Sequence, residues 1–274
     1  MTLLLRLKGL FLRLLPKKVF YMLGYLLGYL WFYVLRIRRN EAIKNVCMVL
    51  GVDRDEGKRI VLQSMINIVI SFLEFISQRK VKVAYKGLEN WIQRLKGGAI
   101  VATAHTSNWD ILERVACENS IKLGVLSRKT KFSPLQSLLE ELRRSRNEVV
   151  FWEHTGIATL VRFLRSEGVL GVVIDQNMPP RHGRPAKFFN KMVNTTFTPQ
   201  ILSIRSGRPI IPVFIRRVEL GSYEIIFYEP HILRDHSDEE IQNSMNYLNE
   251  LLEKFIRENP SQWLWVHKRF KPLR

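Results

Sequence analysis

Cysteine is scarce in this chain of 274 residues, which contains only Cys47 and Cys117. Two isolated cysteines exclude a disulfide-stapled fold, because such folds need several paired cysteines in a much shorter chain. The cysteines do not have the spacing of zinc ligands, and the histidines show no metal-binding spacing either. We therefore expect a reducing, cytoplasmic environment for the main domain and no metal site.

Long apolar runs are also few. Hydrophobic residues make up 46% of the chain, which is too many for a disordered protein. A polytopic membrane protein would show several runs of about 20 apolar residues, whereas the sequence has one candidate, Val19–Leu35. What remains is a globular protein with a normal core, built as one large domain or two small ones.

Acidic residues are outnumbered, with 25 Asp and Glu against 43 Lys and Arg, so the formal net charge is +18. Such an excess indicates partners rather than a fold. Three acidic partners fit: nucleic acid, an anionic membrane surface, and an acidic substrate or carrier protein. Nearly half of the excess lies in residues 1–46, which hold nine basic residues and one acidic residue.

The uncharged run Val19–Leu35 is typical of a membrane anchor. A helix of this length spans roughly 25 Å, which is marginal for a bilayer. Basic residues flank both of its ends and give no clear orientation, so a shallow or tilted helix fits better than a span. The preceding Met1–Leu15 is rich in leucine and contains three basic residues, a pattern that suits an anionic surface. We expect an N-terminal membrane segment over 1–46 and a catalytic domain over 47–274; the alternative is a buried helix of the globular domain.

The rest of the chain alternates between strand and helix patterns. Residues 97–104 and 169–174 are short apolar runs bounded by glycine, as expected for strands buried on both faces of a parallel sheet. The capping box Ser237–Glu240 predicts the start of a helix. Further helices are expected over 56–77, 135–146, 155–166 and 199–206, and further strands over 81–85, 122–127, 210–215 and 223–228. The predicted fold is α/β, with a mostly parallel central sheet flanked by helices.

Polar side chains follow the two apolar strands, where open α/β sheets bind their ligands. His105 and Asp110 follow the first strand, and Asp175 and Gln176 follow the second. A carboxylate in the first turn of the next helix can reach back to a histidine at a strand end, fix its tautomer and stabilise the imidazolium. The sequence presents no serine or cysteine nucleophile on a tight turn, so the substrate would supply one, most simply a hydroxyl. The alternative is that His105 is structural.

Three segments resemble one family. His105 and Asp110 have the H-x4-D form of glycerolipid and lipid A acyltransferases. Gly168–Gln176 is similar to the glycine-bounded strand ending in Asp-Gln of the bacterial lipid A biosynthesis (late, or secondary) acyltransferases, which are part of the wider lysophospholipid acyltransferase superfamily. Asn259–Lys271 resembles the C-terminal segment of that family. The chain departs from the family pattern at Phe188–Asn190, where a Phe-Phe-Gly step is usual.

The resemblance implies transfer of a fatty acyl chain from an acyl-carrier-protein thioester to a hydroxyl of a lipid A precursor. In the family the acceptor is the 3-hydroxyl of an acyl chain already attached. His105 would be the general base and Asp110 would hold the imidazole. The resemblance implies no metal and no redox cofactor, and it places the enzyme on the cytoplasmic face of the bacterial inner membrane.

Several other residues are candidates for substrate binding. Arg128 follows a predicted strand and could meet acceptor phosphates or the phosphopantetheine of the carrier. Arg181 and Arg184 lie in a stretch without acidic residues that could bind phosphate or the acidic carrier. Asp175 and Gln176 are also candidates for substrate binding. Asp175 is expected to orient a loop or an arginine rather than to take part directly in catalysis.

Three other functions stay open from the sequence. The form His-x-Ser-x-x-Asp at 105–110 is similar to acyltransferases of the glycerol-phosphate type, so another glycolipid or a lysophospholipid is the alternative acceptor. The Pro-Glu-Gly-Thr block of those enzymes is not found here. A membrane-associated lipid-binding protein without catalysis is the alternative outside enzymes. Nucleic-acid binding has charge alone in its favour, since no nucleic-acid motif is present.

Overall fold

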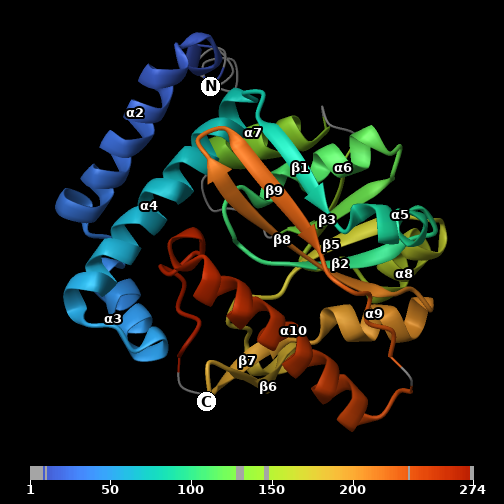
Figure 1. Ribbon diagram of the computed structural model, residues 1–274. Helices are drawn as coiled ribbons and strands as arrows, with labels where there is room; N and C mark the ends of the chain where they lie inside the picture. Colours follow the sequence, from blue (N-terminus) through green and yellow to red (C-terminus); the bar gives the residue numbers. More distant parts are fainter. Residues whose placement is uncertain (1–8, 10, 128–132, 145–147, 234, 272–274) are drawn as a thin grey trace.

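A seven-stranded sheet forms the centre of the structure (Figure 1). The computed structural model describes residues 9, 11–127, 133–144, 148–233 and 235–271. The sheet has the strand order β1-β9-β8-β2-β5-β3-β4. Its strands are β1 (Lys82–Lys86), β2 (Ala99–Thr103), β3 (Leu123–Ser127), β4 (Val149–Trp152), β5 (Val169–Val173), β8 (Ile210–Glu219) and β9 (Ser222–Phe227).

Most neighbours in this sheet are parallel, which confirms the predicted fold class. Strands β8, β2, β5, β3 and β4 all pair in parallel. Only the β8–β9 pair is antiparallel, and β1 joins the edge parallel to β9. All five residues of β2 are buried, because helices cover both faces of the sheet and leave no solvated side for polar residues.

The helices form a layer on each face. Apolar residues of α5 and α6 pack on one face, and those of α8, α9 and α10 pack on the other. Ser237 caps α10 as the sequence predicts, since its Oγ accepts a hydrogen bond from the Glu240 backbone at 3.1 Å. The bounds are α5 (Leu88–Lys96), α6 (Leu112–Glu118), α7 (Ser133–Arg144), α8 (Ile157–Arg165), α9 (Thr198–Ser206) and α10 (Asp238–Glu258).

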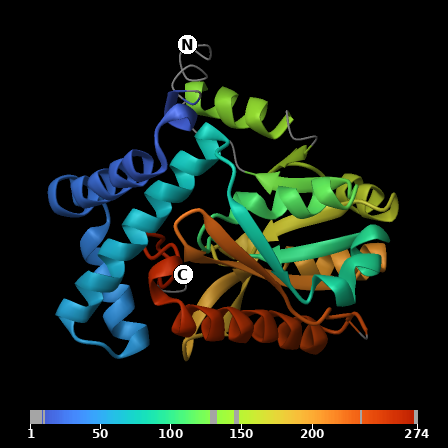
Figure 2. The same ribbon diagram turned by 45° about the horizontal axis from the view of Figure 1, so that its top comes forward.

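The N-terminal helices lie together beside the β8–β9 part of the sheet (Figures 1 and 2). They are α2 (Lys17–Tyr29), the π-helical turn η1 (Leu30–Leu35), α3 (Arg39–Leu50) and α4 (Arg54–Ser77). Gly24 and Gly28 of α2 face Ile70 and Ile66 of α4 so closely that a Cβ at either glycine would lie 2.5 Å from the isoleucine side chain. The two helices therefore pack with their backbones unusually close.

Among the described residues, two helical stretches are long and apolar enough to cross a membrane, Lys17–Leu35 and Arg54–Ser77. The sequence predicted only the first. In the apolar window of the second stretch, 61% is buried, as expected of a core helix, whereas in that of the first only 28% is buried. The domain boundary expected at residue 46 falls inside α3.

The stretch that contains Arg184 forms an antiparallel hairpin of β6 (Gly183–Phe188) and β7 (Lys191–Thr196), which the sequence did not predict. Its turn places Phe189 and Asn190 at φ angles of 50° and 55°. Asparagine tolerates this left-handed region better than most residues, which explains how Asn190 can stand where the family usually has glycine.

Candidate active site

The register between β2 and β5 brings His105 and Asp175 together. Thr103 lies opposite Val173 at the carboxyl ends of these strands, and the Ile174 backbone N–H donates to the Thr103 carbonyl at 2.9 Å. His105 and Asp175 each follow two residues after this pair. Because the strands are parallel neighbours, the two side chains emerge at the same edge of the sheet.

Asp175 holds the imidazole of His105 by two contacts. The His105 backbone N–H donates to Asp175 Oδ2 at 3.0 Å, and Nδ1 lies 2.8 Å from Oδ1. Trp263 Nε1 donates to Oδ2 at 2.8 Å. Asp175 is only 2% exposed, so its charge is compensated by these three donors rather than by solvent.

The electrostatics of this pair favour an ionised aspartate and a basic histidine. Burial alone lowers the pKa of His105, but the charge of Asp175 and its hydrogen bond outweigh this, so the pKa is raised. Burial alone raises the pKa of Asp175, but His105 and Trp263 lower it well below its usual range. With the carboxylate at Nδ1, this nitrogen keeps its proton, which leaves Nε2 to accept one from a substrate.

Asp175, not Asp110 as expected from the sequence, holds the imidazole at Nδ1. The Asp110 carboxylate lies in the short 3-10 turn Trp109–Ile111, 3.8 Å from Arg143 Nη2. That turn directs Asp110 towards the cavity wall, while Asp175 occupies the position at Nδ1. The charge of Asp110 still raises the pKa of His105, after the larger effects of Asp175.

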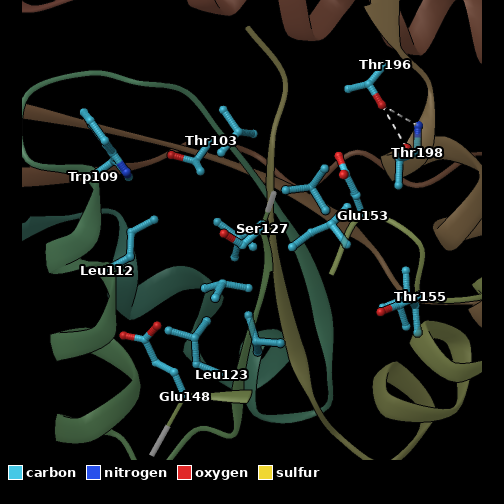
Figure 3. A pocket seen from close by; sticks show the side chains of 18 of the residues that line it. Thr103, Trp109, Leu112, Leu123, Ser127, Glu148, Glu153, Thr155, Thr196 and Thr198 are labelled. Carbon is cyan, nitrogen blue, oxygen red and sulfur yellow. Dashed lines mark hydrogen bonds between the residues drawn. The ribbon is translucent and has the colours of Figure 1, made fainter. Parts of the chain in front are cut away.

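His105 and Asp110 line a cavity of about 1080 Å³ beside β3 and β5. Figure 3 shows Leu112 and Leu123 on one side of it and threonine side chains on the other, including Thr155 and Thr196. Its volume is at the upper end of the range of small-molecule sites. The wall contains valine, leucine and isoleucine side chains from both strands and helices, so an apolar chain can occupy it.

Glu113 and Glu148 are among the polar residues of this wall. Burial, together with the hydrogen bond and the charge of Glu113, raises the pKa of Glu148 to about 8. Glu148 is therefore mostly protonated at neutral pH. Arg143 Nε lies 4.0 Å from Glu148 Oε2. A neutral carboxyl group at this place is compatible with an apolar ligand.

The loop after His105 is fixed in a left-handed backbone turn, with Ser107 at φ 47°. The Ser107 backbone N–H donates to the Gln262 carbonyl at 2.8 Å, and its Oγ donates to Gln262 Oε1. The Leu264 backbone N–H donates to the His105 carbonyl at 3.2 Å. These contacts hold a conformation that serine adopts only at an energetic cost.

A buried polar network extends from this loop to the N-terminal helices. The carboxylate of Glu74 accepts hydrogen bonds from Tyr21 of α2 at 2.9 Å, from Asn108 at 3.1 Å and from Tyr223. Arg217 of β8 forms an ion pair with Glu74 at 3.6 Å. Glu74 is 2% exposed. One buried carboxylate thus connects α2, the loop after His105 and the sheet.

The C-terminal segment holds residues of the site in place by buried hydrogen bonds. Trp263 donates to Asp175, and the fully buried Arg269 donates to the Gln176 carbonyl at 2.7 Å and to the Asn194 carbonyl at 2.8 Å. The sequence alone predicts no catalytic or binding role for Trp263, Arg269 or Glu74. Trp263 and Arg269 lie in the C-terminal segment that resembles the family, and this position could have marked them. Glu74 lies in an apolar helix, where nothing in the sequence indicates a role.

The other predicted binding residues lie in different surroundings. Gln176 lines the cavity, and its Nε2 is 3.4 Å from His105 Nε2. Arg184 is paired with Asp238 at 2.6 Å, and it is not among the described residues that line the cavity. The backbone of Arg181 lies in the turn Pro180–His182, but its side chain is outside what the structure describes, and Arg128 lies outside the described residues altogether.

Together the fold and the site define an α/β protein with a histidine held by a buried aspartate beside a large, mostly apolar cavity. A family model described as "Bacterial lipid A biosynthesis acyltransferase" matches residues 3–272. The chain therefore belongs to the bacterial lipid A biosynthesis acyltransferases and is an enzyme that transfers acyl groups.

Two relatives from Escherichia coli agree with this assignment. The chain is 23% identical over 269 residues to the "Lipid A biosynthesis lauroyltransferase" of Escherichia coli K12, covering 94% of this chain and 87% of that one. A 99-residue stretch is 32% identical to the "Lipid A biosynthesis palmitoleoyltransferase" of the same organism, covering 35% and 31% of the two chains. Among solved structures, the 1-acyl-sn-glycerophosphate acyltransferase PlsC of Thermotoga maritima aligns with a TM-score of 0.43 and 16% identity, over 91% of this chain and 100% of that one.

Proposed function

We propose that this enzyme transfers a fatty acyl group from the thioester of acyl-carrier protein to a hydroxyl of a lipid A precursor. The observation that carries the proposal is the imidazole of His105, held at Nδ1 by Asp175 and lining the large cavity. The names of the two Escherichia coli relatives support the acceptor class. The net charge of +18 suits both a phosphorylated acceptor and an acidic carrier.

The chemical step needs one base and one acyl donor. His105 Nε2 removes the proton of the acceptor hydroxyl as the oxygen attacks the thioester carbonyl. The Asp175 carboxylate stabilises the imidazolium that forms, and the charge of Asp110 adds to this. When the tetrahedral intermediate collapses, the carbon–sulfur bond breaks and the proton passes from Nε2 to the thiolate. The products are the acyl ester and the free thiol of the carrier, and no metal or redox step is required.

We assign the fatty acyl chain to the apolar part of the cavity. Its walls bring Leu112, Leu123 and Val173 within reach of a chain whose thioester lies at His105. Glu148 belongs to the same cavity, and its pKa of about 8 keeps it mostly neutral at pH 7. The acyl chain therefore meets no full charge from Glu148 under ordinary conditions.

We place the enzyme on the cytoplasmic face of the inner membrane, attached through α2 and η1. Apolar side chains on this part of the surface are exposed, including Val19, Met22, Leu26, Leu30, Tyr33, Val34 and Leu35. Lys17 and Lys18 at one end and Arg36 at the other can meet anionic headgroups. The other face of α2 is packed on α4, which favours a helix lying in the interface over an isolated span.

The assignment is tested by supplying the purified full-length enzyme with acyl-carrier-protein thioester and either a lipid A precursor or a lysophospholipid. The expected product is the lipid A precursor with one additional acyl ester, detected by mass spectrometry. Parallel reactions with acyl-coenzyme A identify the donor. Transfer to the lysophospholipid alone would contradict the proposed acceptor, and transfer from acyl-coenzyme A alone would contradict the proposed donor.

A further inference from the structure

A second, smaller pocket lies between η1, α3 and the first turns of α4, away from the catalytic cavity. Its volume is about 460 Å³. Apolar side chains contribute to its wall, and two of them, Phe32 and Ile43, are buried in the core. The third, Leu62, is partly buried. The pocket is therefore a hollow between packed helices rather than a flat patch of surface.

The charged lining of this basic pocket is strongly positive. It consists of Arg39, Arg54, Lys58, Arg59 and the single carboxylate Asp55. Asp55 is paired with Lys58 at 2.7 Å and is 89% exposed. Among the residues that the structure describes, no carboxylate forms an ion pair with Arg39 or Arg54. Two guanidinium groups thus remain available to an anion.

Arg39 is held in place without a counter-charge. Its guanidinium lies 5.2 Å from the centre of the Phe32 ring, and its Nη1 donates to the Phe32 carbonyl at 3.3 Å. Stacking fixes the plane of the group and leaves other N–H groups to donate. A planar guanidinium is suited to two parallel hydrogen bonds with phosphate oxygens.

The surface next to the basic pocket is apolar. Tyr33, Val34, Leu35 and Ile37 are each more than half exposed. Tyr33 itself lines the pocket. Cations beside exposed aliphatic side chains match the chemistry of a phospholipid, which presents a phosphate next to acyl chains. A nucleic acid would match the cations but not this aliphatic surface.

We propose that the basic pocket binds the headgroup phosphate of an anionic phospholipid of the membrane. The guanidinium groups of Arg39 and Arg54 bind the phosphate oxygens, and the lipid chains lie along the exposed residues of η1. A lipid held at this point sets the orientation of α2 to α4 at the bilayer. The proposal does not depend on acyl transfer, because neither the pocket nor its test involves His105.

The test is lipid retention by the full-length protein, measured by native mass spectrometry after incubation in detergent with phosphatidylglycerol or phosphatidylcholine. The wild type should retain one phosphatidylglycerol and little phosphatidylcholine. In the variant Arg39→Gln/Arg54→Gln, affinity should fall roughly 25-fold, about fivefold for each cation near an anionic lipid. The control Lys86→Gln/Lys96→Gln removes the same charge on β1 and α5, which lie apart from α3 (Figure 1), and should behave as the wild type.

Two further experiments distinguish a specific phosphate site from general electrostatic attraction to the membrane. Arg39→Lys/Arg54→Lys preserves the charge but removes both planar donors, so its lipid retention should fall while general attraction to anionic vesicles is kept. Inorganic phosphate should fail to displace the lipid at millimolar concentration. Equal losses in the pocket and control variants, full retention by the lysine variant, or ready displacement by inorganic phosphate would each overturn the proposal.

Discussion

Replacing Asp175 with asparagine should remove nearly all acyl transfer while leaving the fold in place. The aspartate uses Oδ2 for the His105 backbone N–H and for Trp263, and Oδ1 for Nδ1 of the imidazole. An asparagine oxygen can keep the first two donors only if the amide nitrogen faces Nδ1. That nitrogen would donate to Nδ1 and shift the ring proton to Nε2, so the imidazole could no longer act as the base.

The expected size of the loss follows from the geometry. A carboxylate 2.8 Å from Nδ1 attracts the imidazolium by about 6 kcal/mol at an effective dielectric constant of about 20. Removing that attraction slows the step by roughly 10⁴-fold, the same size as the effect of an Asp→Asn change in a Ser-His-Asp triad. The charge of Asp110 raises the pKa of His105 less strongly than Asp175 does, so Asp110→Asn should cost about 10- to 100-fold.

The assay is single-turnover transfer to the lipid A precursor from a saturating acyl-carrier-protein thioester, with thermal unfolding as the check on folding. A folded Asp175→Asn enzyme within tenfold of the wild-type rate would refute the reasoning. A greater loss in Asp110→Asn than in Asp175→Asn would also refute it, because it would return the main electrostatic role to Asp110.

Four further results are expected. In chemical denaturation, Glu74→Gln should lower the free energy of unfolding by about 3–5 kcal/mol, since it leaves Arg217 buried without its counter-charge. Adding Arg217→Met should recover part of the lost stability. An unchanged free energy of unfolding in Glu74→Gln would contradict this role of the ion pair. Gly28→Leu should cost about 1–3 kcal/mol in the same measurement, because the new side chain collides with α4. The KM for the acyl donor should rise above a pH of about 8 as Glu148 ionises, and Glu148→Gln should abolish this rise. Because the base must be unprotonated and the pKa of His105 is raised, kcat/KM should fall on acidification with an inflection above that of a free histidine; an inflection below it would contradict the assignment.

The two apolar strands were predictable because their residues suit few structures other than a buried strand. Ala99–Thr103 and Val169–Val173 lie inside the predicted ranges, since glycine-bounded runs without polar residues suit only strands covered on both faces. Helix α4, predicted over 56–77, begins at Arg54 because Asp53 caps it, with Oδ1 accepting from two backbone N–H groups. Local rules therefore located these elements well.

The identity of the carboxylate at Nδ1 was not predictable from local rules. His105 and Asp110 are close in sequence, and their spacing suggests that Asp110 is the carboxylate that holds the imidazole. Asp175 reaches the imidazole only because β5 lies next to β2 with Val173 opposite Thr103, and strand order depends on the packing of the whole sheet. The polar network around Glu74 is of the same kind, because its partners come from α2, β8, β9 and the loop after β2.

The central claim is that His105 is the base for acyl transfer to a lipid A precursor hydroxyl. The most direct test compares the wild type with His105→Ala in single-turnover transfer, after showing that the variant unfolds at the wild-type temperature and still binds the acyl-carrier-protein thioester. The wild type should yield the acylated lipid A precursor, and the variant should transfer the acyl chain at least about 10³-fold more slowly. A folded variant that transfers the acyl chain at the wild-type rate would contradict the claim.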